Sequence, residues 1–115
     1  MKIETFELYQ AEAVKTMGAH WNDFDDGLMY GALGLCGEAG EIAEHVKKYL
    51  SKSRALPEKD ELRKEIGDVL WYLASLSKHL GLTLAECAEH NIIKLRKRHG
   101  ETFSGHGDRS TKEAQ

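Results

Sequence analysis

The sequence has little proline, little cysteine and no long apolar run, and each shortage excludes a class of protein. A single proline, Pro57, argues against a β-sandwich or barrel, because such folds need many short turns. Cys36 and Cys87 stand alone without a CxxC pair, which argues against a disulfide framework and predicts reduced thiols. The longest uncharged stretches, such as 27–37, are far shorter than the roughly 20 apolar residues of a membrane-spanning helix. We therefore expect no membrane partner.

A strong charge of one sign is also missing. The net charge is −3 over 115 residues, so no basic field recruits nucleic acid and we expect no nucleic-acid partner. The chain opens Met-Lys-Ile-Glu-Thr, which does not resemble a secretory signal peptide and predicts a cytoplasmic protein. What is present, 41% hydrophobic and 30% charged residues, is ordinary for one globular domain.

Helical periodicity runs through most of the chain, with apolar residues recurring every three or four positions. The clearest stripe includes Leu62, Ile66 and Val69, and a capping-box pattern opens at Thr83. We expect an all-α fold, an antiparallel four-helix bundle forming a single domain over 1–100, followed by a polar, mobile tail over 101–115. The expected helices cover about 5–17, 26–51 with Asp26 as its N-cap, 58–80 and 83–100.

Glycine, by contrast, is frequent in the second expected helix. Each interior glycine costs a helix about 1 kcal/mol relative to alanine, so the series needs an explanation. Either the helix approaches a neighbour closely, or bulk is excluded beside a ligand, and the two interpretations are compatible. The glycines recur at spacings of four, three, three and three: Gly27, Gly31, Gly34, Gly37 and Gly40.

Two pairs of carboxylates have the spacing of a shared helix face. Glu38 and Glu41 lie three apart in the second helix, and Glu65 and Asp68 lie three apart in the third. If the two helices pack antiparallel, the pairs face each other. Acidic pairs set into apolar helix surface are costly unless a cation neutralises them. Hard oxygen ligands of this kind suit Mg²⁺, with Mn²⁺ as a substitute.

These carboxylates have two other interpretations. One is a pair of solvated acidic helix faces, which is common for a single ExxE but less so for two pairs embedded in apolar sequence. The other is a di-iron carboxylate bundle, which requires Glu-x-x-His motifs. No histidine of this chain has a glutamate three residues before it, so the divalent-cation interpretation is favoured.

The motifs resemble those of MazG-like nucleotide pyrophosphohydrolases, an all-α family related to dCTP pyrophosphatases and dimeric dUTPases. The segments that carry the resemblance are GEAGE over 37–41, EIGDVLWY over 65–72 and KLRKR over 94–98. The resemblance implies hydrolysis of a nucleoside triphosphate, deoxy or non-standard, between the α and β phosphates, giving the monophosphate and pyrophosphate. It also implies a homodimer or homotetramer.

The resemblance implies roles for the acidic residues. By the family's pattern Glu38, Glu41, Glu65 and Asp68 are the ligands of Mg²⁺, and Glu38 is our candidate for the base that takes a proton from the attacking water.

Six further residues are candidates for substrate binding. For the cations, phosphate binding competes with plain solvation, and for the aromatic residues base contact competes with core packing. For the asparagine, a ligand contact competes with an interhelical hydrogen bond. The candidates are Trp21, Lys48, Tyr72, Asn91, Lys94 and Arg98.

Two other functions remain open at this stage. Phosphoribosyl-ATP pyrophosphohydrolases share the helical ExxE and ExxD frame, although the GDVLWYL segment over 67–73 fits the MazG-like branch better. A non-catalytic helical bundle that binds a nucleotide or a partner is the alternative from a different class.

Overall fold

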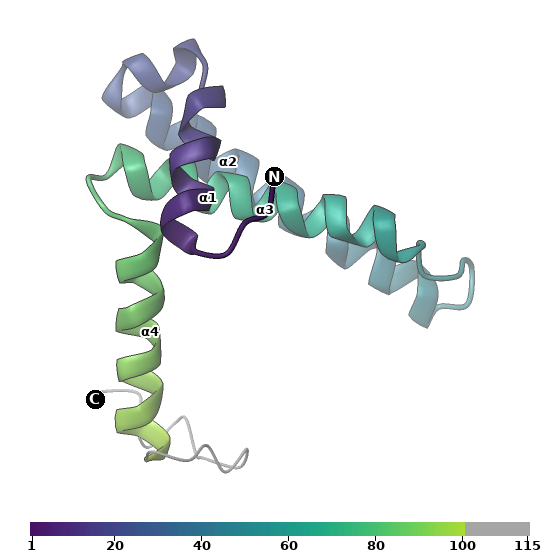
Figure 1. The fold of residues 1–115 in the computed structure, drawn as a ribbon. Coiled ribbons are helices and arrows are strands. Elements are labelled where there is room, and N and C mark those ends of the chain that lie inside the picture. The colour runs from purple at the N-terminus through teal and green to yellow at the C-terminus, as the bar shows by residue number, and fades with distance from the viewer. Residues whose placement is uncertain (101–115) are drawn as a thin grey trace.

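A computed structural model of the protein describes residues 1–100, which form helices joined by short connections and contain no strand (Figure 1). The all-α prediction is confirmed, while the predicted tail over 101–115 lies outside the described residues. No helix within 1–100 combines the length and the apolar character needed to cross a bilayer. The elements are α1 (Phe6–Ala13), the 3₁₀ turns η1 (Val14–Thr16) and η2 (Ala19–Asn22), α2 (Phe24–Leu50), α3 (Lys59–His79) and α4 (Leu84–His99).

The helix boundaries follow local capping chemistry. At α2 the N-cap is Asp23, whose carboxylate accepts a hydrogen bond from the backbone N–H of Asp26, so the prediction of Asp26 as N-cap is wrong. At α4 the predicted capping box is present, with Thr83 and Glu86 bonding to each other's backbone. Between α3 and α4 the chain turns at Gly81, whose φ of 76° favours glycine.

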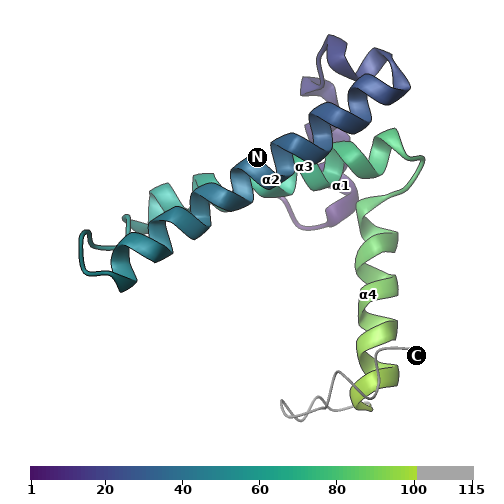
Figure 2. The ribbon, with the colours of Figure 1, turned by 180° about the vertical axis from the view of Figure 1, so that it is seen from behind.

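The longest helices, α2 and α3, run antiparallel as one extended pair, and α1 lies across the C-terminal half of α3 (Figures 1 and 2). The glycines of α2 permit close packing of this pair, because a methyl group at Gly31 would overlap Leu76 and one at Gly34 would overlap Tyr72. Gly40, in contrast, meets nothing within 4 Å in the described residues. The first part of the glycine series therefore serves helix–helix approach.

The last helix, α4, leaves the other three at a steep angle and projects as an arm (Figures 1 and 2). Its start is held by Gln10 of α1, a buried residue whose amide Nε2 donates to the carbonyl oxygens of Ala74 (3.1 Å) and Leu82 (3.3 Å). The amide oxygen of Gln10 accepts from the backbone N–H of Leu84 at 2.9 Å. One side chain thus ties α1, the end of α3 and the start of α4 together.

Candidate functional site

Carboxylates of α2 and α3 meet where the two helices face each other. Glu38, Glu65 and Asp68 each offer one oxygen, and these oxygens all lie within 4.8 Å of one another. The spacing of three places Glu65 and Asp68 on one side of α3, and the antiparallel packing of α2 brings Glu38 opposite them. The structure therefore brings three of the four predicted cation ligands together.

The surroundings of these carboxylates suit a divalent cation. Glu65 is buried, and Glu38 is half-buried with its Oε2 shielded from solvent and without a hydrogen-bond donor among the described residues. A buried carboxylate oxygen with no donor is costly, and a bound cation removes that cost. The donor set is made of hard oxygens, which is the chemistry that Mg²⁺ and Mn²⁺ prefer.

The fourth predicted ligand, Glu41, is solvent-exposed and lies beside the other three. A hydrogen bond with Glu65, together with the negative charges of Glu38 and Glu65, raises the pKa of the Glu41 carboxyl above its usual range. The direction of this shift shows that negative charge is crowded here. A divalent cation held by the same groups would lower the pKa of this carboxyl again.

Sequence reasoning missed His45, which belongs to this cluster. Its Nε2 lies 3.2 Å from Oε1 of Glu65, and both side chains are largely shielded from solvent. His45 follows Glu41 by four residues on α2, so the helical spacing alone was enough to place it on the same face. The Glu-x-x-His pattern of di-iron sites has a spacing of three and therefore does not include this pair.

Because His45 holds Glu65, we expect its removal to loosen the carboxylate cluster. The variant His45→Ala should bind Mn²⁺ about 10- to 100-fold more weakly than the unchanged protein, as is typical when a residue that orients a ligand is lost. Titration with Mn²⁺ followed by electron paramagnetic resonance measures this directly. The control is His90→Ala, an exposed histidine on α4, and equal Mn²⁺ affinity in both variants contradicts the prediction.

A cavity of about 430 Å³ reaches Gly34, which precedes Glu38 by one turn of α2, and is walled by aromatic rings. The rings of His20 and Tyr30 stack at 4.4 Å with an interplanar angle of 8°, and the ring of Tyr72 lies 6.0 Å from that of Tyr30. The residues that line the cavity are His20, Asp26, Met29, Tyr30, Leu33, Gly34 and Tyr72.

Tyr72 joins this cavity to the carboxylate cluster. Burial, a hydrogen bond with Tyr30 and the charges of Glu38 and Asp68 raise the pKa of Tyr72 to about 12. Its hydroxyl therefore remains protonated at neutral pH and keeps a hydrogen to donate. Tyr72 is the predicted substrate-binding residue that lies nearest to the carboxylates along α3.

Trp21 is placed behind the cavity and does not line it. Its ring is buried and makes edge contacts with Tyr30 at 5.7 Å and with His79 at 5.3 Å. The neighbouring residue, His20, is the one that presents its ring to the cavity. The sequence singles out Trp21, but which of the two adjacent rings faces the cavity depends on the geometry of η2.

The remaining predicted substrate contacts lie away from the carboxylates within one chain. Lys48, near the end of α2, has its Nζ 3.8 Å from Oε1 of Glu44. Asn91, Lys94 and Arg98 are spaced along one face of the α4 arm, which points away from the α2–α3 pair (Figure 2).

Comparisons with known proteins match most of the chain. Residues 31–103 match the MazG nucleotide pyrophosphohydrolase domain, and this range contains the carboxylates, His45 and Tyr72. The chain is similar to the Gene 37 protein of Mycobacterium phage L5, at 35% identity over 112 residues, which are 94% of this chain and 98% of the phage protein. No solved structure matches the chain.

Proposed function

Because the chain belongs to the MazG nucleotide pyrophosphohydrolase family, we propose that it hydrolyses a deoxy- or non-standard nucleoside triphosphate between the α and β phosphates in the presence of Mg²⁺. The products are the nucleoside monophosphate and pyrophosphate. The observation that carries this proposal is the cluster of Glu38, Glu65 and Asp68 at the α2–α3 contact, next to an aromatic-walled cavity.

In this proposal the carboxylates hold the cation and handle the proton. Glu38, Glu41, Glu65 and Asp68 would bind Mg²⁺, which supplies positive charge to the phosphate oxygens when bound. Glu38 accepts the proton of the attacking water, whose oxygen bonds to phosphorus as the bond to the bridging oxygen breaks and pyrophosphate leaves. Glu38 lies among the carboxylates that would hold the cation, which supports this assignment. His45 keeps Glu65 in place throughout.

A pyrophosphate-release assay tests the proposed reaction. Ribo- and deoxynucleoside triphosphates are incubated with the protein in Mg²⁺ and, separately, in excess EDTA, and the nucleotide product is identified by chromatography. We expect pyrophosphate and monophosphate in equal amounts with Mg²⁺ and neither with EDTA. Release of single phosphate, or no release from any nucleotide including phosphoribosyl-ATP, contradicts the proposal.

The predicted self-association has support from the distribution of apolar side chains. Large apolar residues are exposed on three helices, with Leu33 at 67%, Ile66 at 59% and Ile93 at 57% exposure. Exposed apolar surface on this scale is typical of an interface. Among the described residues, the apolar side chains that are buried within one chain are only Ala13, Trp21, Ala74 and Leu84.

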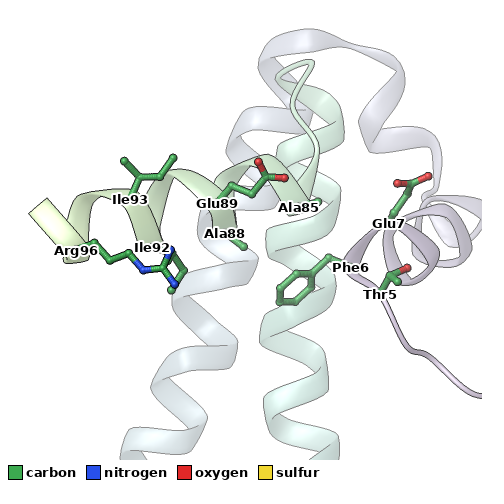
Figure 3. Close-up of a pocket in the computed structure, with 9 residues that line it drawn as sticks. All are labelled: Thr5, Phe6, Glu7, Ala85, Ala88, Glu89, Ile92, Ile93 and Arg96. Carbon is green, nitrogen blue, oxygen red and sulfur yellow. The ribbon is translucent and has the colours of Figure 1, made fainter. Parts of the chain in front are cut away.

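A groove on the α4 arm belongs to this exposed surface. It has a volume of about 580 Å³ and lies between the start of α1, with Phe6, and the side chains of Ala88 and Ile92 on α4 (Figure 3). We infer that a second copy of the chain covers these surfaces in a homodimer or homotetramer. The α4 arm of one copy then brings Lys94, with Asn91 and Arg98 on the same helix face, to the carboxylates of the other copy.

A charge placed in this groove should break the assembly. Ile93→Glu puts an unpaired carboxylate where the second copy packs, which costs several kcal/mol at a buried interface, so we expect the monomer mass by light scattering at micromolar concentration. The control is His90→Glu, which adds a glutamate at an exposed position of α4 that does not line the groove. A monomeric unchanged protein, or an unchanged mass for Ile93→Glu, contradicts the inference.

A further inference from the structure

We propose that Asp26 makes the aromatic-walled cavity selective for nucleobases that carry an exocyclic amino group, such as cytosine and adenine, over bases with a carbonyl at the same position. This inference rests on the proposed function, because it concerns which nucleoside triphosphate that site accepts. Asp26 and its neighbour in space, His20, both precede the residues 31–103 that match the family domain. Both residues therefore lie outside the part of the chain that matches the family domain.

The first observation is the path along α2 from the carboxylates to Asp26. Asp26, Tyr30, Gly34 and Glu38 follow one another at intervals of four residues, so they form a continuous ridge on the helix surface. Along this ridge Asp26 lies about 18 Å from Glu38, at 1.5 Å per residue. A nucleotide with its phosphates at Glu38 extends its base along the ridge towards Asp26.

The second observation is the shape of the cavity that lies on this path. Gly34 has no side chain, and the ring of Tyr72 occupies the space where a methyl group would stand. At the opposite end of the cavity the rings of His20 and Tyr30 stack on each other, with their centroids 4.4 Å apart. Flat aromatic walls of this kind suit the face of a nucleobase, because base–aromatic stacking tolerates every base. The walls therefore hold a base without choosing among bases.

The choice is made by the polar groups at the edge of the cavity. Nδ1 of His20 lies 3.4 Å from Oδ2 of Asp26, so the two side chains lie side by side at the edge of the cavity. No hydrogen bond in the described part of the chain ends on the side chain of Asp26, so its carboxylate is available as an acceptor. An ionised carboxylate only accepts hydrogen bonds. It binds the N–H hydrogens of an amino group and is repelled by a carbonyl oxygen.

The experiment compares nucleotides that carry either an amino group or a carbonyl at this position of the base. The pairs are dCTP against dUTP, which differ at the pyrimidine 4-position, and dATP against dITP, which differ at the purine 6-position. The measured quantity is the ratio of kcat/KM within each pair, from Mg²⁺-dependent pyrophosphate release. We expect the amino-bearing member to be preferred about tenfold or more in both pairs, which is the usual discrimination by a well-placed hydrogen bond to a base edge.

The decisive variant is Asp26→Asn. An amide both donates and accepts, so the variant should use dUTP as well as dCTP, with a ratio below about threefold. The matched control is Asp25→Asn, an exposed aspartate in the same first turn of α2 that does not line the cavity, and it should keep the original ratio. Because each ratio is taken within one protein sample, a loss of folded protein does not change it.

The outcomes separate this inference from the proposed function. Pyrophosphate release without preference within either pair, or an unchanged ratio in Asp26→Asn, overturns the role of Asp26 and leaves the reaction intact. If no nucleotide is hydrolysed, the proposed function fails, and titration calorimetry with dCMP and dUMP tests the cavity by itself. Tighter binding of dCMP that is lost in Asp26→Asn supports the inference, and equal binding of the two monophosphates overturns it.

Discussion

Replacing Asp68 with asparagine is expected to reduce Mg²⁺-dependent pyrophosphate release by roughly 100-fold or more. Asp68 is an exposed member of the cluster whose oxygens lie within 4.8 Å of one another. The amide keeps the shape of the side chain but removes the negative charge that binds the cation. Because Asp68 is exposed, the substitution leaves no buried group without a partner, so helical content and melting temperature should hardly change.

The control for this prediction is Asp60→Asn, which makes the same chemical change in the first turn of α3. Asp60 pairs with Arg63 on the surface, and such exposed pairs contribute little to stability. Full activity in Asp60→Asn together with a large loss in Asp68→Asn locates the effect at the cluster. Retention of the original rate in Asp68→Asn means that Asp68 is not needed for binding the cation.

Replacing Gln10 with alanine is expected to destabilise the fold by about 3 kcal/mol, because it leaves buried backbone groups without partners. Those groups are the carbonyl oxygens of Ala74 and Leu82 and the N–H of Leu84. For a domain of this size such a loss lowers the melting temperature by about 10–20 °C. Thermal unfolding followed by circular dichroism measures the shift.

Two further variants complete this test: one changes which hydrogen bonds the side chain of residue 10 can make, and the other is a control on the same helix. Gln10→Glu keeps an acceptor for the N–H of Leu84 but has no hydrogens to donate, so it should be nearly as unstable as the alanine variant. Glu12→Ala removes only a surface ion pair with Lys15 from the same helix and should cost less than about 1 kcal/mol. If the Gln10→Ala protein is as stable as the Glu12→Ala protein, the hydrogen bonds of Gln10 do not stabilise the contact of α1 with α3 and α4.

The carboxylate cluster was predictable because it depends only on the spacing of residues within each helix and on the antiparallel packing of the two helices. Residues three apart share a helix face, and a short loop between long helices makes them antiparallel. These two facts bring Glu38, Glu65 and Asp68 together without any knowledge of side-chain packing. The N-cap of α2 was not predictable in this way, because Asp23 and Asp26 are equally suitable as chemical groups and only the backbone path decides between them.

The position of α4 and the aromatic cavity were beyond the sequence for a different reason. The apolar stripe of α4 shows that one face is buried, but an apolar face packs equally well on its own chain or on a second copy. Likewise, His20 and Trp21 are adjacent aromatic residues, and only the 3₁₀ geometry of η2 turns one ring into the cavity and the other into the core. Tertiary geometry decides both cases.

The small set of apolar side chains buried within one chain has a consequence for how the protein behaves on dilution. A domain gains its stability mainly from burying apolar surface, and here much of that surface is left on the outside of α2, α3 and α4. When a second copy supplies the missing burial, folding and assembly become one equilibrium. The midpoint of thermal unfolding then rises with protein concentration, and a cell that makes few copies of the chain holds little of it in the folded state.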